Sequence, residues 1–400
     1  MKIALFADTW LPNTNGVVYS MINEVRALQD QHEFVLFVPK EQEVYLDGRP
    51  DIRSVEFRSI AFPGYPGYNI ALPDSKLRKI IQKERFDLVH SHTPFSMWLM
   101  AKLLARVQKI PFIQTFHTWI SEYAGHFLGG FAEAQVRWLG QPMSWWITRF
   151  AHNGADASIT PSKILKLELE RHDITSPIFP VPSAISSVFF KRKFTEFQKE
   201  ELKVQFKERF GIPRDSTLLM YVGRVSFEKR LELLLHLTKR LQAYNSDIYF
   251  AVVGDGPHLQ SYRKLARKLR VQNRAIFTGF VDHYSLPRVY SAADLFVAPS
   301  DTETQGLTLV EAMSQRTPVI SVKAGGVIDY IRHEKNGLFV PPRDVKALEE
   351  AVKRLLTDSA LSEKLGNEGY QTAQNYTPQV FAERLNKIFD FAIENHKAFR

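Results

Sequence analysis

The stretch APSDTETQGLTLVEA, residues 298–312, joins an apolar strand to a helix that begins near Gly306. The unpaired backbone N–H groups of Gly306, Leu307 and Thr308, together with the positive end of the helix dipole, predict an anion-binding site. Because glycine has no Cβ, a phosphate can approach the backbone closely at Gly306. A strand, a polar loop and a helix start in this order indicate an α/β domain that binds a phosphate.

Two carboxylates belong to the same stretch. Glu303 lies in the loop, and Glu311 lies one turn into the helix, where side chains tilt back toward the N-terminus. Carboxylates repel phosphate but accept hydrogen bonds from hydroxyls, so we expect one of them to bind a sugar and the other a ribose. The alternative is an N-capped helix with solvated glutamates.

Outward from this stretch, short apolar runs alternate with longer amphipathic runs, which predicts βαβ units and parallel sheets. Strands are expected in the first half at residues 2–7, 33–38, 87–90, 112–116, 156–159 and 178–181. After 186–210, interpreted as a linker and one helix, strands are expected at residues 217–222, 248–253, 275–278, 294–298 and 318–321. Two such successions predict two doubly wound, Rossmann-like domains, whereas an eight-fold barrel requires one unbroken series.

Open sheets bind ligands at the carboxyl ends of their strands, and a basic loop follows the strand at 217–222. In it, Gly223 and Arg224 precede Lys229. A guanidinium and an ammonium five residues apart can converge on a diphosphate and stabilise a departing nucleotide diphosphate. Because no carboxylate pair is arranged for magnesium, we expect this chemistry to need no metal or other cofactor. Taken alone, the two cations are more simply explained as solvated.

Two glycine turns follow other strands. Gly256, in VGDGP, is expected to lie close to a nucleotide, and Gly279 and Phe280, in TGFV, to meet a base edge. Neither turn fits Gly-x-Gly-x-x-Gly, and a Walker P-loop is absent. Each turn by itself is better explained by tight backbone geometry.

The first half contributes Gly16, in a turn after the first strand, and His117, after the fourth. A histidine just past a strand end is a candidate partner of a sugar hydroxyl or carrier of an acceptor proton. The alternative is a hydrogen-bonded packing histidine. His90 and His92 follow another strand and His126 lies further on, but their spacing matches no zinc pattern, and no metal is expected.

Composition limits the possible functions. The chain has 400 residues, 44% hydrophobic and 24% charged, which is globular and suggests two or three domains. It has no cysteine, which excludes disulfides and thiolate sites. The apolar N-terminal run is too short for a signal peptide, and no run spans a bilayer, so a cytoplasmic location is expected. The net charge of +9 indicates either an anionic partner or solubility alone, and no nucleic-acid-binding module or basic stripe is present.

Together these motifs resemble glycosyltransferase family 4, retaining enzymes of the GT-B fold, over almost the whole chain. The most specific element is the pair of glutamates separated by seven residues, Glu303 and Glu311, and the second is Gly223, Arg224 and Lys229. The resemblance implies that Arg224 and Lys229 bind the donor diphosphate and that Glu311 binds the ribose.

Further roles follow from the same resemblance. It implies that Glu303 holds the transferred sugar with the amides of Gly306 and Leu307, that His117 lies beside this sugar, and that Gly16 approaches the phosphates from the opposite domain. It also implies front-face retention, in which the acceptor hydroxyl attacks from the leaving-group side and a phosphate oxygen takes its proton.

The resemblance predicts an acceptor-binding domain at 1–185, a nucleotide-sugar-binding domain at 186–376, and a helix at 377–400 that crosses back to the first domain. At the hinge this chain reads PSAI, residues 182–185, where relatives carry a glycine. The hinge geometry is therefore expected to differ while the donor site is unaffected.

Residues 91–97 (SHTPFSM), 115–118 (TFHT) and 304–308 (TQGLT) are most similar to bacterial diacylglycerol glucosyltransferases, peripheral membrane enzymes that use UDP-glucose. This implies transfer of glucose from UDP-glucose to a lipid acceptor such as diacylglycerol. A soluble sugar or polysaccharide acceptor is the nearest alternative. A non-catalytic nucleotide-sugar-binding protein is a further alternative, which the intact glutamates and cations oppose.

A basic helix is expected at 75–86, with its apolar side chains inward. Its basic residues are Lys76, Arg78, Lys79, Lys83 and Arg85. Each can contribute about 1 kcal/mol at an anionic lipid surface. Aromatic residues suited to an interface are Trp119, Tyr123, Phe127, Trp138, Trp145 and Trp146. The sequence therefore predicts a peripheral location on the inner face of the cell membrane, the alternative being a solvated helix over a well-filled core.

Overall fold

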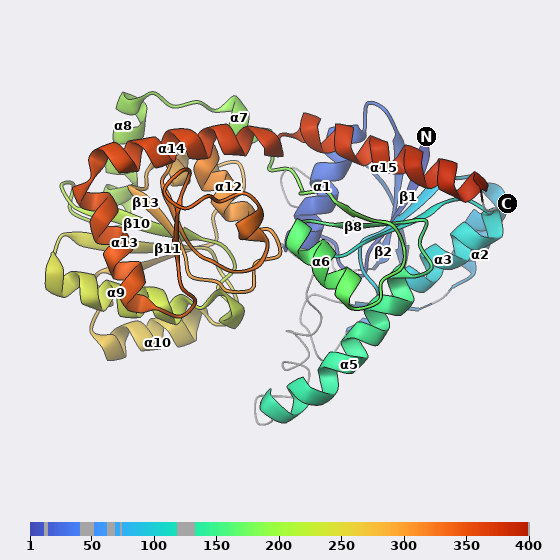
Figure 1. The fold of residues 1–400 in the computed structure, drawn as a ribbon, viewed down its shortest axis with the longest axis horizontal. Coiled ribbons are helices and arrows are strands. Elements are labelled where there is room, and N and C mark those ends of the chain that lie inside the picture. Colours follow the sequence, from blue (N-terminus) through green and yellow to red (C-terminus); the bar gives the residue numbers. More distant parts are fainter. Residues whose placement is uncertain (12–14, 41–51, 62–68, 73, 118–132, 399–400) are drawn as a thin grey trace. The chain divides into compact units, whose positions relative to one another are not determined.

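The computed structural model describes residues 1–11, 15–40, 52–61, 69–72, 74–117 and 133–398, and only the backbone of residues 133–141 and 397–398. The chain divides into two compact units (Figure 1). Unit 1 comprises Met1–Ala184 with Pro378–Arg400, and unit 2 comprises Ile185–Thr377. None of the described helices combines the length and apolar character needed to span a bilayer.

Unit 1 is built on a parallel seven-stranded sheet with the strand order β3-β2-β1-β6-β7-β8-β9. Its strands are β1 Lys2–Phe6, β2 Glu33–Pro39, β3 Arg53–Phe57, β6 Leu88–Ser91, β7 Phe112–Thr115, β8 Ala157–Thr160 and β9 Ile178–Pro180. The central strands are apolar and buried because helices cover both faces of the sheet. A separate antiparallel pair consists of β4 Ser59–Ala61 and β5 Asn69–Ala71.

The helices of unit 1 are α1 Gly16–Leu28, α2 Ser75–Lys83, α3 Ser96–Gln108, α5 Glu133–His152, α6 Lys163–Arg171 and α15 Pro378–Ala398. α1 begins where the side chain of Asn15 accepts hydrogen bonds from the N–H groups of Val17 and Val18, which is a typical N-cap. α15 packs against α1, and the apolar faces of both helices join the same core.

Unit 2 is built on a parallel six-stranded sheet with the order β12-β11-β10-β13-β14-β15. Its strands are β10 Thr217–Val222, β11 Ile248–Val253, β12 Ala275–Gly279, β13 Leu295–Ala298, β14 Val319–Val322 and β15 Leu338–Val340. Its helices are α7 Val188–Lys191, α8 Glu196–Arg209, α9 Leu231–Tyr244, α10 Leu259–Leu269, α11 Leu286–Ser291, α12 Leu307–Ser314, α13 Val345–Thr357 and α14 Ser359–Ala373. Three 3-10 turns are η2 Phe227–Lys229, η3 Gly325–Asp329 and η4 Gln374–Tyr376. Separate apolar cores fill the two faces of this sheet.

Each sheet reverses its winding direction once. In unit 2 the chain runs from β10 outward through β11 and β12, and then returns to the other side of β10 at β13. In unit 1 the corresponding reversal lies between β1 and β6. Loops that leave adjacent strands at such a point diverge and open a crevice, where α/β sheets bind their ligands.

The predicted fold, two doubly wound α/β domains with parallel sheets, is confirmed. The expectation of one helix within 186–210 was wrong, since that segment holds both α7 and α8. Two strands of the main sheets, β3 and β15, were not expected, and neither was the separate pair β4 and β5. β15 has only three residues, and β3 is an edge strand with only one fully buried side chain, so neither carries the long apolar run on which the prediction depended.

Candidate active site

The two loops that carry most of the predicted donor-binding residues leave adjacent strands of unit 2. β10 pairs with β13 through Leu219 opposite Leu295 and Met220 opposite Phe296. The basic loop after β10 and the acidic loop after β13 therefore start side by side at the winding reversal of the sheet. This is the place where an α/β sheet binds a ligand.

A lysine and a glutamate join these two loops. Nζ of Lys229, in η2, donates a hydrogen bond to Oε1 of Glu303 at 2.7 Å. The side chains are 23% and 18% exposed, so the ion pair is partly shielded from water yet accessible. The structure thus brings together the ammonium expected to bind a diphosphate and the carboxylate expected to bind a sugar.

The basic loop is shaped by close backbone contacts. Gly223 has a φ of +151°, and the amide of Val225 donates to the carbonyl of Asp255 at 2.9 Å. A Cβ on Gly254 would lie 2.0 Å from the carbonyl oxygen of Gly223, and one on Gly256 would lie 2.4 Å from that of Val225. Only glycine at these positions lets the loop after β11 lie against the basic loop.

Gly256 therefore has a structural role in supporting the backbone around Arg224, whose carbonyl also accepts a hydrogen bond from the Tyr221 hydroxyl at 3.3 Å. The side chain of Arg224 is partly exposed. At the end of β12, Gly279 adopts a φ of +79° and Phe280 is 56% exposed. A glycine turn that presents an aromatic ring is compatible with the predicted contact to a base.

The helix start at α12 has the geometry that the sequence predicted. Gly306 is its N-cap with a φ of +75°, a left-handed conformation that favours glycine. Its carbonyl accepts a hydrogen bond from the buried Tyr330 hydroxyl at 3.0 Å, and a Cβ would lie 2.8 Å from Cγ1 of Val327. Leu307 and Thr308 form the first turn, so their N–H groups lie at the positive end of the helix dipole.

Glu311 is buried, with 8% of its surface exposed. Its Oε2 accepts a hydrogen bond from the Tyr290 hydroxyl at 2.7 Å. Burial raises the pKa of Glu311 to about 7, although the hydrogen bond from Tyr290 opposes the shift. The alternative of a solvated glutamate is therefore excluded at this position, and the carboxylate is poised to change charge near neutral pH.

Two glycines that the sequence analysis did not single out hold the acidic loop in place. The amide of Gly326, in η3, donates to the carbonyl of Glu303 at 2.8 Å. A Cβ on Gly325 would lie 2.2 Å from the carbonyl oxygen of Glu303, and one on Gly326 would lie 1.9 Å from that of Thr304. Their signal in the sequence was a glycine pair just after a predicted strand. The two buried tyrosines, Tyr290 and Tyr330, gave no local signal.

Two predicted site residues belong to unit 1. Gly16 is exposed at the first position of α1. His117 follows β7, and its Nε2 lies 2.9 Å from Nδ1 of His92. The partner of His117 is therefore another histidine of unit 1, which the sequence did not predict. His126 lies outside the described residues.

The ligand atoms of Glu24, His90 and His92 all lie within 4.8 Å of one another, so this group has the spacing of a possible metal site. However, Nδ1 of His90 is 2.8 Å from Oε1 of Glu24. Two ligands of a tetrahedral zinc ion, each about 2.1 Å from the metal, would be separated by about 3.4 Å. The shorter observed distance fits a shared proton better than a metal.

Comparison with known proteins agrees with this architecture. Residues 14–187 match the family model Glycosyltransferase Family 4, and residues 203–372 match the model Glycosyl transferases group 1. Alpha-monoglucosyldiacylglycerol synthase of Streptococcus pneumoniae is 29% identical over 97% of this chain and 86% of its own length. A GDP-mannose-dependent alpha-mannosyltransferase of Corynebacterium glutamicum is 27% identical over 91% of this chain and 82% of its own length.

The fold has counterparts among solved structures. The crystal structure of Anabaena Alr3699/HepE in complex with UDP-glucose superimposes with a TM-score of 0.77 at 16% identity, covering 98% of this chain and 99% of that one. Two family models together span most of the chain, and the two Rossmann-like sheets are those of the GT-B architecture. The chain is therefore a glycosyltransferase that belongs to family 4 and has the GT-B fold.

Proposed function

We propose that this glycosyltransferase is a retaining enzyme that moves glucose from UDP-glucose to a lipid acceptor such as diacylglycerol at an anionic membrane surface. The observation that carries the donor half of this proposal is the contact between Lys229 and Glu303 at the winding reversal of the unit 2 sheet. It joins a cation suited to phosphate and a carboxylate suited to sugar hydroxyls within one small region.

The donor chemistry follows from the charges. The ammonium of Lys229 already has an anionic partner, and a diphosphate would offer it a second, more highly charged one. As Lys229 shifts toward the phosphates, the Glu303 carboxylate gains capacity to accept hydrogen bonds from the sugar. Arg224 and the helix start at Gly306 add further positive charge, which stabilises the departing diphosphate.

Retention is then assigned to the front-face route. The acceptor oxygen bonds to the anomeric carbon as the bond from that carbon to the phosphate oxygen breaks, and the phosphate oxygen takes the acceptor proton. In this route the protein stabilises the leaving group and positions the reactants, and it supplies no covalent nucleophile. Glu311 accepts hydrogen bonds from the ribose.

The acceptor half of the proposal depends on the surface of unit 1. The five basic residues predicted to meet lipid, at positions 76, 78, 79, 83 and 85, are all exposed on or just after α2. The nearby acidic residue Glu84 is paired with Arg53 at 2.6 Å and with Lys2 at 3.4 Å. Both partners of Glu84 lie outside α2, so this carboxylate is paired with cations other than the five basic residues.

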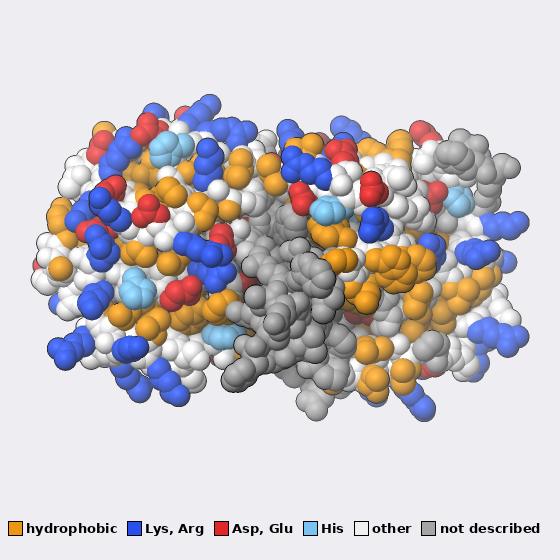
Figure 2. Space-filling model, turned by 60° about the horizontal axis from the view of Figure 1, so that its bottom comes forward, with side chains coloured by type: hydrophobic (Ala, Val, Ile, Leu, Met, Phe, Trp, Pro, Cys, Tyr) orange, Lys and Arg blue, Asp and Glu red, His pale blue; other side chains and the backbone are white. Residues whose placement is uncertain are grey.

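Exposed apolar side chains lie on the neighbouring helices. On α3 they are Leu99, Leu103 and Val107, and on α5 they are Met143, Trp146 and Phe150, each between 50% and 61% exposed. The two helices touch, since Trp98 of α3 donates from its ring nitrogen to the carbonyl of Ala151 at 3.2 Å. Figure 2 shows hydrophobic side chains gathered in patches beside Lys and Arg on the visible surface of unit 1. An apolar surface next to a basic helix fits an anionic bilayer.

Not every residue of the earlier prediction can be placed on this surface. Trp119, Tyr123 and Phe127 lie outside the described residues, and the side chain of Trp138 is not described. Trp145 stacks on His172 with ring centroids 3.6 Å apart. Trp146, a predicted aromatic residue on α5, is exposed.

The direct test is transfer from labelled UDP-glucose to diacylglycerol in vesicles of phosphatidylglycerol, with the anomeric configuration of the product read by NMR. The proposal expects an α-linked glucolipid, because UDP-glucose is itself α-linked. A β-linked product would contradict retention. Absence of any lipid product, with sugar transferred to a soluble acceptor instead, would contradict the lipid acceptor alone.

A second candidate is transfer to a soluble acceptor or from another donor. The similarity to a GDP-mannose-dependent mannosyltransferase over 91% of the chain favours keeping this candidate. A panel of UDP- and GDP-sugars, each offered with lipid and with soluble sugars, separates the two candidates in one experiment.

A further inference from the structure

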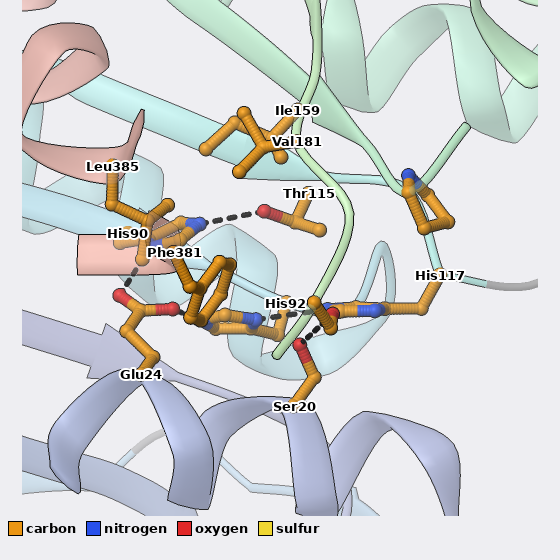
Figure 3. Close-up of a pocket in the computed structure, with 12 residues that line it drawn as sticks. Ser20, Glu24, His90, His92, Thr115, His117, Ile159, Val181, Phe381 and Leu385 are labelled. Carbon is orange, nitrogen blue, oxygen red and sulfur yellow. Dashed lines mark hydrogen bonds and ion pairs between the residues drawn. The ribbon is translucent and has the colours of Figure 1, made fainter. Parts of the chain in front are cut away.

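A buried cluster of polar side chains lies in unit 1 between α1 and the ends of β6 and β7 (Figure 3). Glu24 comes from α1, His90 from β6, His92 from the residue after β6, and His117 from the loop after β7. The first three side chains are 1%, 1% and 2% exposed. The pocket that they line has a free volume of about 10 Å³, which is roughly the room needed for one water molecule.

The contacts form a chain that starts at the carboxylate. Oε1 of Glu24 lies 2.8 Å from Nδ1 of His90, and Oε2 lies 3.3 Å from Nε2 of His92. Nδ1 of His92 lies 2.9 Å from Nε2 of His117. The other nitrogen of His90, Nε2, lies 2.6 Å from the hydroxyl of Thr115. His92 therefore connects the carboxylate to His117.

The charge states follow from the surroundings. Burial alone would raise the pKa of Glu24, but His90 and His92 outweigh it and hold the pKa below its usual range, so Glu24 is ionised and only accepts hydrogen bonds. Burial lowers the pKa of His92 to about 4, and His90 adds to this shift while Glu24 opposes it. Burial also lowers the pKa of His117 well below its usual range, with His92 and His90 acting in the same direction. His92 and His117 are therefore neutral at pH 7.

A neutral imidazole has one N–H donor and one acceptor nitrogen. Nε2 of His92 lies 3.3 Å from Oε2 of Glu24 but is not aligned for a hydrogen bond with it. Even so, an unprotonated Nε2 would place its lone pair close to an anionic oxygen, which is repulsive, whereas an N–H there is attracted to it. The proton of His92 is therefore on Nε2, and its Nδ1 accepts a hydrogen bond. The donor of that bond is Nε2–H of His117, which leaves Nδ1 of His117 as an acceptor.

We propose that Glu24 is a positioning residue that fixes, through His92, the tautomer of His117, so that Nδ1 of His117 accepts a hydrogen bond from a hydroxyl of the substrate. Within the described part of the chain, no group forms a hydrogen bond with this nitrogen, and His117 as a residue is partly exposed. The contact to the substrate rests on the proposed function, whereas the tautomer does not.

The tautomer can be measured on the full chain without any substrate. Long-range ¹H–¹⁵N NMR of ¹⁵N-labelled protein at pH 7.5 distinguishes protonated from unprotonated ring nitrogens. We expect His92 and His117 to carry their protons on Nε2. In Glu24→Met, which keeps the length of the side chain but removes the acceptor, both rings should lose this preference. His152, buried elsewhere in unit 1 and paired with Ser158 at 2.9 Å, serves as an internal reference that should not change.

The matched control is Glu349→Met, the same substitution at a buried glutamate of unit 2. It should leave the signals of His92 and His117 unchanged. A proton on Nδ1 of His117 in the unmodified protein would overturn the proposal even if Glu24→Met failed to fold. Unchanged ring signals in a folded Glu24→Met protein would overturn it as well. One equivalent of tightly bound zinc that is lost in this variant would show that the cluster is a metal site instead.

The second test measures enzyme activity with UDP-glucose as the donor. We expect kcat to fall about 10- to 100-fold in Glu24→Met, the range for losing a group that orients a functional histidine from behind, with little change in KM for the donor. If hydrolysis of UDP-glucose without acceptor falls as much as transfer does, the hydroxyl that binds His117 belongs to the donor sugar. If only transfer falls, the hydroxyl belongs to the acceptor. A changed tautomer with unchanged kcat would overturn the role in positioning. A wild-type protein inactive with UDP-glucose would refute the proposed donor and leave the NMR result standing.

Discussion

Glu311→Gln is expected to stabilise unit 2 while weakening nucleotide binding. The pKa of the Glu311 carboxyl is raised from the ordinary 4.5 to about 7, chiefly by burial. Between these two values the folded protein keeps a proton that the unfolded chain has released. Stability therefore decreases as the pH rises through this range, and the full loss is present above about pH 7. At about 1.4 kcal/mol per pKa unit, the free energy of unfolding of the wild type falls by ~3 kcal/mol.

Glutamine cannot ionise, and its carbonyl oxygen can still accept the hydrogen bond from Tyr290. The variant should therefore be only slightly more stable than the wild type near pH 5 and exceed it by up to ~3 kcal/mol at pH 8. The assay is scanning calorimetry with urea unfolding from pH 5 to pH 8.5, with and without UDP. UDP should raise the melting temperature of the wild type and should do so much less in the variant, because the amide is a weaker acceptor for ribose hydroxyls than an ionised carboxylate.

Glu349 provides the matched control, because it is also 8% exposed. Its pKa is lowered by hydrogen bonds from Lys353 and Arg240, against the opposing effect of burial. Glu349→Gln should therefore destabilise the protein above pH 5, which is the opposite sign. A stability difference between Glu311→Gln and wild type that does not grow with pH would refute the reasoning about burial. Undiminished binding of UDP would refute the role of Glu311 in the donor site.

Three further predictions concern the donor loops and the membrane surface. Arg224→Ala should lower turnover by about 10²-fold or more if its guanidinium stabilises the leaving diphosphate, and near-normal turnover would contradict that role. Gly326→Ala should displace the Glu303 loop, since the new Cβ would meet the carbonyl oxygen of Thr304 at 1.9 Å. We expect KM for the donor to rise in this variant, and an unchanged KM would show that the loop is not part of the donor site. Trp146→Glu should reduce co-sedimentation with phosphatidylglycerol vesicles about 10-fold, because roughly 1.5 kcal/mol of apolar contact is lost. The control is Phe197→Glu, at a residue 74% exposed in unit 2, which should leave co-sedimentation unchanged. Equal effects of the two substitutions would argue against a membrane-binding surface on α3 and α5.

The sequence predicted the strands and helices of the candidate donor site well because their signals are local. A strand end, a polar loop and a glycine before an apolar helix are all contained in residues 298–312, and α12 begins at Leu307 as expected. The same holds for β10, whose bounds match the predicted range. The pairing of β10 with β13 could not be derived from local patterns, and the resemblance to a family supplied what the residues alone did not.

The contacts that depend on tertiary packing were not predicted. Glu24 lies within an amphipathic helix and carries no sign that two histidines from β6 and the following loop will enclose its carboxylate. Tyr290 is 21 residues before Glu311 in the chain, so no local spacing relates them. His117 was predicted as a candidate from its place after a strand, but its orientation depends on His92, which can be seen only when the sheet is assembled.

The glycines at positions 254, 256, 325 and 326 place peptide groups directly against peptide groups around the two candidate donor loops. A frame made in this way depends on main-chain atoms, which every sequence shares, and hardly on the identity of the side chains that project from it. Substitutions that alter the preferred nucleotide or sugar can therefore accumulate on the loops without moving the frame. In such a frame the specificity can change through the side chains while the backbone path stays the same, provided that those four positions remain glycine.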